Sequence, residues 1–271
     1  MPFRTLFLSS LLFWTLACQS QNEAVQSAAL RAPDVLIVGH RGYAGAYPEN
    51  SLPGIERALA LGLDRIEIDV HQTRDGQVVL MHDATLQRTT NGRGKVADYN
   101  WSDLQRYQLD FPDSLRTTDR HIPSLDEVLT RFQDQSATLL IEVKKGGAHY
   151  PQIEENILQL LAQHQLTQGV ILQSFDDAVL RRFHELDSSL VLHKLLLSSW
   201  GYDFTELDFV AEFSINYYFA TAALIEDLAK RQQKLNVWTV NTEAQMKKAI
   251  ALGVNGIITD QPERLRALLA R

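Results

Sequence analysis

Titratable side chains recur in this sequence where apolar, strand-like runs end. The run Val35–Gly39 leads into His40 and Arg41, and the run Val78–Met81 leads into His82. Histidine titrates near neutral pH, so two histidines can serve as a general acid and a general base on opposite sides of a reacting centre. We therefore predict that His40 and His82 are catalytic.

Three carboxylates lie in two further apolar runs. Glu67 and Asp69 are two residues apart, and Glu142 is two residues before Lys144. Residues i and i+2 of a strand face the same side, and two carboxylates on one inward face repel unless a strong cation lies between them. Oxygen ligands favour a hard cation, Ca²⁺, Mg²⁺ or Mn²⁺, over zinc. We predict one divalent cation, Ca²⁺ or Mg²⁺, held by Glu67, Asp69 and Glu142. The alternative is a structural ion-pair network of these carboxylates with Arg41 and Lys144.

Two permanent cations accompany this predicted metal site. Arginine binds phosphate in a bidentate manner and lysine binds it as a point charge, so Arg41 and Lys144 are candidate phosphate contacts. A metal, two cations and a histidine pair suit a phosphodiester better than a sugar, because glycoside hydrolysis uses a carboxylate pair free of metal. The segment Asn91–Lys95 lacks the full P-loop spacing and predicts a turn. Trp238 either forms a wall of the substrate pocket or packs in the core.

These residues need a scaffold of parallel strands to bring them together. Strand-like and helix-like segments alternate after residue 34, which indicates a parallel sheet with crossover helices. We expect strands at Val35–Gly39, Asp64–Val70, Thr138–Lys144, Gly169–Ser174, Leu190–Leu196, Phe213–Tyr217, Leu235–Asn241 and Gly256–Asp260. We expect helices at Ser51–Leu61, Gln152–His164, Asp177–Leu186, Ala222–Gln233, Glu243–Leu252 and Pro262–Leu269. Eight such units favour an α/β fold of the TIM (β/α)8 barrel type, although counting alone leaves a doubly wound sheet open. In a TIM barrel the catalytic residues lie at the carboxyl ends of the strands, where the candidate residues fall.

Residues 83–121 interrupt the alternation between the second and third barrel strands. This segment is too long for a simple loop, and it contains several aromatic residues and a helical stretch near Ser102–Tyr107. We predict a small insertion over the barrel mouth within a single domain, residues 34–271. Ser124 and Glu127 have capping-box spacing, which predicts a helix start.

The N-terminal residues are predicted to lie outside this domain. Arg4 precedes an apolar stretch, Leu6–Ala17, that is too short to span a bilayer and is typical of a signal peptide, residues 1–17. Cys18, the only cysteine, follows a sequence that resembles a bacterial lipobox, so we expect it to be lipidated, with residues 18–33 as a flexible tether. An incidental thiol after an ordinary signal is the alternative. The expected location is the bacterial cell envelope, on the periplasmic side or at the outer membrane, with this anchor as the only membrane contact. A net charge of -7 argues against nucleic-acid binding.

Taken together, the motifs resemble those of the glycerophosphodiester phosphodiesterases. They are His40–Gly42, Pro48–Ser51, Glu67–Val70 with Thr73–Gly76, His82–Asp83, Leu86–Thr90 with Gly92 and Gly94, Ile122–Leu125, Glu142–Lys144, Val237–Asn241 and Gly256–Pro262. The resemblance covers residues 35–271 and implies a TIM barrel with a small insertion after the second strand. It implies the same metal ligands, acid–base pair and phosphate contacts, and it adds Glu49 and Asn50 as residues of the pocket mouth.

The resemblance also implies a reaction. The expected activity is metal-dependent hydrolysis of small-molecule glycerophosphodiesters to sn-glycerol 3-phosphate and an alcohol, through a cyclic phosphate or by direct attack of water. Two alternatives are a phospholipase C- or D-like phosphodiesterase acting on intact lipid, and a non-catalytic envelope lipoprotein that binds phosphoesters.

Overall fold

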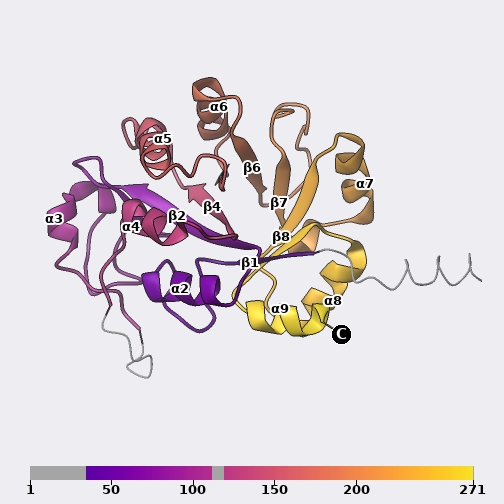
Figure 1. Cartoon of the computed structure of the whole chain (residues 1–271). Coiled ribbons are helices and arrows are strands. Elements are labelled where there is room, and N and C mark those ends of the chain that lie inside the picture. Colours follow the sequence, from indigo (N-terminus) through magenta and orange to yellow (C-terminus); the bar gives the residue numbers. More distant parts are fainter. Residues whose placement is uncertain (1–34, 112–118, 271) are drawn as a thin grey trace, which may run out of the picture. The chain divides into compact units, whose positions relative to one another are not determined.

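The computed structural model describes residues 35–111 and 119–270 (Figure 1). The predicted signal peptide, residues 1–17, the predicted lipidation site Cys18 and the predicted tether, residues 18–33, lie outside the described residues. None of the helices in the described ranges is long and apolar enough to cross a membrane.

Eight parallel strands within the described residues close into a barrel. They are β1 (Leu36–Gly39), β2 (Arg65–Gln72), β4 (Thr138–Val143), β5 (Val170–Ser174), β6 (Val191–Leu196), β7 (Glu212–Asn216), β8 (Lys234–Trp238) and β9 (Gly256–Thr259). Each strand pairs with its neighbour in this order, and β1 pairs with both β2 and β9. This closure confirms the predicted TIM barrel and excludes a doubly wound sheet.

Helices connect the strands and cover the outside of the barrel (Figure 1). They are α2 (Leu52–Ala60), α4 (Leu125–Phe132), α5 (Ile153–Gln163), α6 (Asp177–Leu186), α7 (Ala222–Lys230), α8 (Glu243–Leu252) and α9 (Pro262–Leu269). Their starts follow local sequence signals. The side chain of Ser124 accepts from the backbone N–H of Glu127, and the Glu127 side chain accepts from the Ser124 N–H, which confirms the predicted capping box. Strand β7 ends one residue earlier than predicted, because Tyr217 opens the 3-10 helix η2 (Tyr217–Phe219), which the Asn216 side chain caps.

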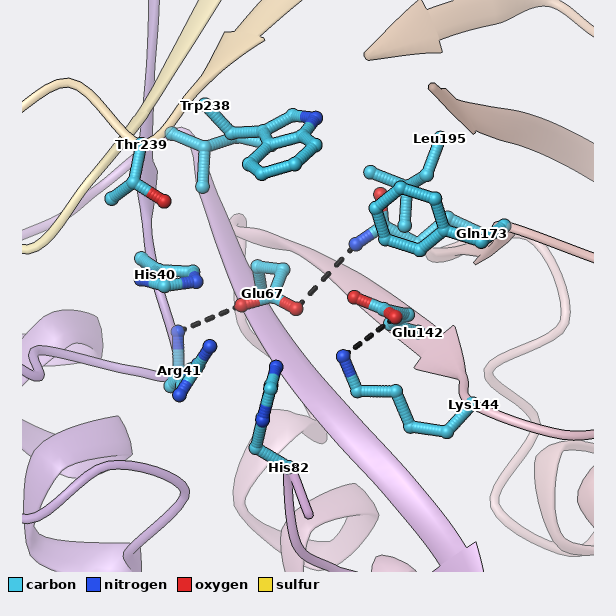
Figure 2. A pocket seen from close by; sticks show the side chains of 12 residues that line it. His40, Arg41, Glu67, His82, Glu142, Lys144, Gln173, Leu195, Trp238 and Thr239 are labelled. Atoms are coloured by element: carbon cyan, nitrogen blue, oxygen red, sulfur yellow. Dashed lines mark hydrogen bonds and ion pairs between the residues drawn. The ribbon is translucent and has the colours of Figure 1, made fainter. Parts of the chain in front are cut away.

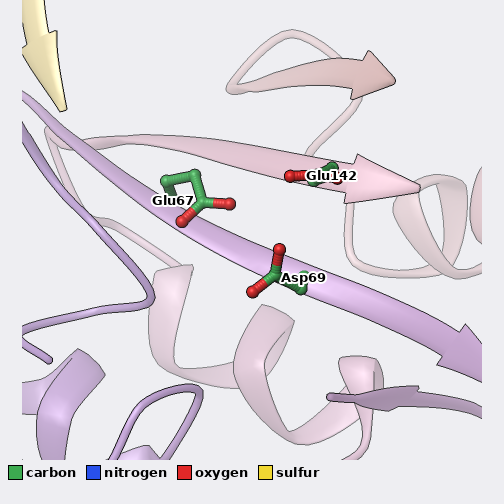
Figure 3. A group of neighbouring side chains, drawn as sticks. All are labelled: Glu67, Asp69 and Glu142. Atoms are coloured by element: carbon green, nitrogen blue, oxygen red, sulfur yellow. The ribbon is translucent and has the colours of Figure 1, made fainter. Parts of the chain in front are cut away.

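The two faces of each strand serve different purposes. Ile66 and Ile68 of β2 belong to the main apolar core between barrel and helices, and burial of each such side chain contributes roughly 1.5–3 kcal/mol. Glu67 and Asp69 alternate with them and face the inside of the barrel (Figure 3). The alternation along β2 therefore places apolar side chains against the helices and the two carboxylates inside the barrel.

A small unit follows the carboxyl end of β2. Strand β3 (Val78–Leu80) pairs antiparallel with the end of β2, and it leads into the 3-10 helix η1 (Val96–Asp98) and the short helix α3 (Trp101–Leu104). A second apolar cluster holds this unit together, formed by Val79, Met81, Leu86, Val96, Leu104, Leu109, Phe111 and Ile122. This unit places His82, two residues after the end of β3, beside the barrel mouth.

Candidate active site

The turn after β1 brings two backbone donors to Glu67, one to its carboxylate and one to its backbone carbonyl. Arg41 has φ +51° and Gly42 has φ +83°, so the chain passes through two successive left-handed conformations. The Arg41 N–H donates to Glu67 Oε2 at 2.8 Å, and the Gly42 N–H donates to the Glu67 carbonyl at 2.9 Å. A left-handed residue other than glycine costs on the order of 1–3 kcal/mol. Here the hydrogen bonds to Glu67 and the bond from the Asn50 N–H to the Arg41 carbonyl hold that conformation.

The three predicted metal ligands converge inside the barrel mouth (Figure 3). Asp69 and Glu142 are direct partners in the β2–β4 register, and Glu67 lies two residues before Asp69 on the same face. One oxygen from each carboxylate lies within 4.8 Å of the others, and all three residues are buried. The structure therefore brings together the residues that the sequence selected for a metal site.

The charges in this cluster are not balanced. Lys144 Nζ lies 2.8 Å from Asp69 Oδ1 and 2.6 Å from Glu142 Oε1, and Arg41 Nε lies 3.3 Å from Asp69 Oδ2. Burial opposes the charged form of Asp69, but Lys144 and Arg41 outweigh it and hold its pKa below the ordinary value. Burial, followed by the charge of Asp69, raises the pKa of Glu142 to about 7. Burial, followed by the charges of Asp69 and Glu142, raises the pKa of Glu67 well above the ordinary value.

This imbalance favours a metal site over a structural ion-pair network. The network accounts for Asp69, but no Lys, Arg or His side chain among the described residues forms an ion pair with Glu67. Its carboxylate receives only the Arg41 N–H and a long hydrogen bond, 3.5 Å, from the Gln173 side chain. Three buried carboxylates with too few cations are a suitable oxygen donor set for Ca²⁺ or Mg²⁺. The residues present therefore fit a hard divalent cation.

Both predicted catalytic histidines are oriented by a carboxylate. His40 Nδ1 lies 2.6 Å from Asp260 Oδ1, and His82 Nδ1 lies 2.7 Å from Asp83 Oδ1. When Nδ1–H donates to a carboxylate, Nε2 is left as the nitrogen that exchanges protons. Asp260 is held in turn by Asn241, whose side-chain oxygen accepts from the Asp260 N–H at 2.9 Å. The two imidazoles thus have the same arrangement, and both line the pocket (Figure 2).

Burial and neighbouring groups shift the pKa values of His82 and Asp260. Burial lowers the pKa of His82, and the nearby charge of Lys144 adds to this, whereas Asp69 opposes it. Burial disfavours the charged form of Asp260, but the hydrogen bond from His40 lowers its pKa below the ordinary value. Asp260 therefore stays ionised and can stabilise a proton on His40.

The predicted phosphate contacts, Arg41 and Lys144, lie beside the carboxylates. Arg41 Nε lies 3.3 Å from Asp69 Oδ2 without forming a hydrogen bond, while Arg41 Nη1 donates to Glu49 Oε1 at 2.8 Å. Asn50 is differently placed from Glu49. Its side chain donates to Asp69 Oδ2 at 2.8 Å and accepts from the Asp69 N–H at 2.9 Å. Asn50 therefore holds a carboxylate of the cluster in place, and its amide is turned toward Asp69.

A pocket with about 400 Å³ of empty space, part of it open to solvent, joins these groups. His40, Arg41, Glu67, His82, Glu142, Lys144 and Gln173 line it together with the less polar Phe175, Leu195, Trp238, Thr239 and Ile258. Trp238 packs edge-on against Phe175, with ring centroids 5.6 Å apart, and its Nε1–H donates to the Ser214 carbonyl at 3.1 Å. It thus combines both alternatives, since it walls the pocket and also packs on the barrel interior (Figure 2).

Sequence reasoning missed several residues of this site, among them Asp260, Gln173 and Arg88. Asp260 directly follows the last barrel strand, and Gln173 is the penultimate residue of the fourth, so their position at the carboxyl ends of strands was a usable signal. Closure of β1 on β9 pairs Gly39 with Thr259, which makes His40 and Asp260 neighbours. Arg88 lies in the unit after β2 and contacts both Glu49 and Asp83. No strand periodicity points to Arg88.

Comparison with known proteins agrees with this geometry. The sequence model of the glycerophosphoryl diester phosphodiesterase family matches residues 40–264. The chain belongs to this family. A glycerophosphodiester phosphodiesterase of Caldanaerobacter subterraneus is 33% identical over 242 residues, which cover 87% of this chain and 98% of the relative. One of Bacillus altitudinis is 35% identical over 233 residues, 84% of this chain and 95% of the relative.

Solved structures of similar fold extend this comparison. A phosphodiesterase of Oleispira antarctica, determined in complex with the product sn-glycerol 3-phosphate, superimposes with a TM-score of 0.82 at 22% identity. The match covers 87% of this chain and 97% of that one. At this identity the likeness concerns the fold, which is the barrel already described for this member of the glycerophosphoryl diester phosphodiesterase family.

Proposed function

We propose that this protein hydrolyses glycerophosphodiesters to sn-glycerol 3-phosphate and an alcohol, with the help of a divalent cation and two histidines. The observation that carries the proposal is the single pocket in which an under-neutralised carboxylate cluster adjoins two carboxylate-oriented imidazoles and the cations Arg41 and Lys144. Membership of the family supports the substrate class, and so does the product bound by the Oleispira antarctica protein of the same fold.

Each group has a task in this reaction. A divalent cation bound by Glu67, Asp69 and Glu142 would supply Lewis-acid chemistry, neutralising charge that develops on the phosphate and acidifying a substrate hydroxyl. Arg41 and Lys144 bind the non-bridging phosphate oxygens and fix the phosphorus between the two imidazoles.

The histidines move the protons. In the proposed first step, Nε2 of one histidine takes the proton of the glycerol 2-hydroxyl, whose oxygen attacks phosphorus. The bond from phosphorus to the leaving alcohol breaks, and the other histidine gives its Nε2 proton to that alcohol. The resulting cyclic phosphate is opened by water. Water loses a proton to the second histidine while the first protonates the released 2-hydroxyl, so that both return to their starting states. The carboxylates of Asp260 and Asp83 keep both Nε2 atoms directed to the substrate.

A hydrolysis assay tests this function directly. Glycerophosphocholine, glycerophosphoethanolamine, lysophosphatidylcholine and phosphatidylcholine are supplied to the wild type in EDTA and after add-back of Ca²⁺ or Mg²⁺. We expect release of sn-glycerol 3-phosphate from the first two substrates only with added metal. Undiminished turnover in EDTA would contradict metal dependence. Turnover of phosphatidylcholine alone would support the alternative of a phospholipase C- or D-like phosphodiesterase. Equal rates in the wild type and His40→Asn would support the non-catalytic alternative.

The route of hydrolysis needs a separate measurement. A rapid-quench time course with glycerophosphocholine should show glycerol 1,2-cyclic phosphate that rises and decays before the final product accumulates. Product formation without this species, in a quench that recovers an added cyclic phosphate standard intact, would favour direct attack by water.

We also propose that the protein is exported and anchored to the cell envelope through lipidated Cys18. The lone cysteine after a lipobox-like sequence supports this location. Expressed in a bacterium, the wild type should partition into the detergent phase of a Triton X-114 extract, whereas Cys18→Ser should remain in the aqueous phase. Equal partitioning of both proteins would contradict the anchor.

A further inference from the structure

Arg88 joins two carboxylates at the edge of the pocket. Its Nε and Nη2 donate to Asp83 at 2.7 and 3.1 Å, and its Nη1 and Nη2 donate to Glu49 at 2.8 and 2.7 Å. Four of the five N–H donors of the guanidinium are thereby engaged. Arg88 belongs to the unit that follows β2, whereas Glu49 lies in the connection between β1 and α2. The guanidinium therefore ties two separate segments of the chain together.

Each of these carboxylates also holds a side chain that faces the substrate pocket. Asp83 Oδ1 lies 2.7 Å from His82 Nδ1, and Glu49 Oε1 accepts from Arg41 Nη1 at 2.8 Å. A continuous chain of hydrogen bonds thus runs from His82 through Asp83, Arg88 and Glu49 to Arg41. Its two ends are a proposed acid–base group and a proposed phosphate contact.

Arg88 differs from Arg41 in how many of its donors form hydrogen bonds. Arg41 Nε lies 3.3 Å from Asp69 Oδ2 but forms no hydrogen bond, whereas Arg88 forms four hydrogen bonds to protein carboxylates. Hydrogen bonds from Arg88 are the first cause that lowers the pKa of Asp83, to about 2. Burial disfavours ionised Glu49, but Arg88 and Arg41 lower its pKa as well. Arg88 therefore keeps both carboxylates ionised and available to the side chains they orient.

The partial exposure of Arg88 indicates that its ion pairs contribute little to the stability of the fold. Its side chain is 46% exposed, and ion pairs at such positions typically contribute only about 0–1 kcal/mol to folding. The planar, forked guanidinium, by contrast, fixes the directions of the Asp83 and Glu49 carboxylates, which the point charge of a lysine would not do. The arrangement is better suited to orientation of the site than to stabilisation of the fold.

We propose that Arg88 is a positioning residue that sets the orientation of both His82 and Arg41 through Asp83 and Glu49. The inference rests on the proposed function of the same pocket, because it assigns Arg88 to the groups that act there. It gives a task to the Leu86–Thr90 motif, which the function itself leaves unused, and it makes the unit after β2 a part of the catalytic apparatus.

Steady-state kinetics with glycerophosphocholine test the proposal. Arg88→Gln should lower kcat and raise KM, so that kcat/KM falls about 10- to 100-fold, the effect typical of losing an orienting partner. Its melting temperature should stay within a few degrees of the wild-type value. Arg88→Lys should recover only part of the loss. The control Arg106→Gln removes the same charge from an exposed side chain of the same unit, 78% exposed and paired only with Asp103 among the residues described here, and it should match the wild type. Wild-type kinetics in Arg88→Gln, or full recovery in Arg88→Lys, would overturn the proposal.

A double-mutant cycle shows through which residues Arg88 acts. Asp83→Asn should act mainly on kcat, because it releases His82, and Glu49→Gln should act mainly on KM, because it releases Arg41. In the Glu49→Gln/Asp83→Asn background, Arg88→Gln should add less than about a threefold loss. Losses that simply multiply would mean that Arg88 acts by another route. If Arg88→Gln does not fold, Arg88→Lys is compared in the wild-type and Glu49→Gln/Asp83→Asn backgrounds instead. A wild type that hydrolyses no glycerophosphodiester refutes the proposed function, whereas an active wild type with an unaffected Arg88→Gln refutes this inference alone.

Discussion

Two clusters of buried charge occupy the interior of the same barrel. At the amino-terminal end of the strands, Arg65 donates both Nη atoms to the Glu212 carboxylate at 2.8 Å each, and Asn236 adds a third bond at 2.8 Å. At the carboxyl end, the carboxylates of Glu67, Asp69 and Glu142 share the cations of Arg41 and Lys144. Strand β2 contributes to both clusters, through Arg65 and, two and four residues later, Glu67 and Asp69.

Glu212 of the first cluster and Glu67 of the second have pKa values shifted in opposite directions. Burial disfavours ionised Glu212, yet the hydrogen bonds from Arg65 and His193 lower its pKa far below the ordinary value. The pKa of Glu67 is raised instead. The first cluster is complete within the chain, whereas the second lacks positive charge. A buried carboxylate that the fold does not neutralise marks a place for an external cation.

The largest expected difference concerns Glu67→Gln, which keeps the shape of the side chain and removes its charge. Loss of a metal ligand removes several kcal/mol of transition-state stabilisation, so we expect kcat/KM for glycerophosphocholine to fall by about 10³-fold or more. The melting temperature of the metal-free protein should be unchanged or higher, because a buried, under-neutralised charge is gone. Hydrolysis rates and thermal melting in EDTA check both expectations. A destabilised but active variant would show that the cluster of Glu67, Asp69 and Glu142 is structural.

Glu212→Gln is the counterpart at the other end of the barrel. It leaves buried Arg65 without its carboxylate, and breaking a buried ion pair typically costs about 3–5 kcal/mol of unfolding free energy. Urea unfolding measures this loss, and kcat of the folded variant should stay near the wild-type value. Arg65→Met/Glu212→Leu removes both charges and should recover much of the stability. A loss below about 1 kcal/mol in Glu212→Gln would remove the distinction between the clusters.

Metal add-back sharpens the comparison without mutation of the site. Ca²⁺ or Mg²⁺ at 100 times its dissociation constant should raise the unfolding free energy of the EDTA-treated wild type by about 2.7 kcal/mol, because only the folded state binds it. Differential scanning fluorimetry should show this shift in Glu212→Gln also, and should not show it in Glu67→Gln. A shift of equal size in all three proteins would place the cation elsewhere.

The sequence could predict those parts of the site whose residues lie close together along the chain. Glu67 and Asp69 share one strand face, and His82 follows an apolar run, so strand periodicity and the position of strand ends were enough to select them. The pair His40–Asp260 spans 220 positions and needs the barrel to close before it becomes visible. Arg65 and Glu212 meet across the barrel interior, from strands that are not neighbours. Contacts between side chains so far apart in the sequence leave no periodic pattern, which is why sequence reasoning missed the Arg65–Glu212 cluster and Arg88.

Acid stability offers the smallest test of the same contrast. The folded-state pKa of Glu212 lies below its ordinary value of 4.5, so below about pH 4.5 the unfolded chain binds the proton first. Stability is therefore full above this pH and falls as the pH drops toward the folded-state pKa. Between pH 4.5 and pH 3 this group alone removes up to about 2 kcal/mol, at 1.36 kcal/mol per pH unit. Urea unfolding at pH 5 and pH 3 should show a larger loss in the wild type than in Glu212→Gln, whose amide does not titrate. Equal losses of unfolding free energy in the two proteins would mean that the acid sensitivity of the barrel arises outside the Arg65–Glu212 cluster.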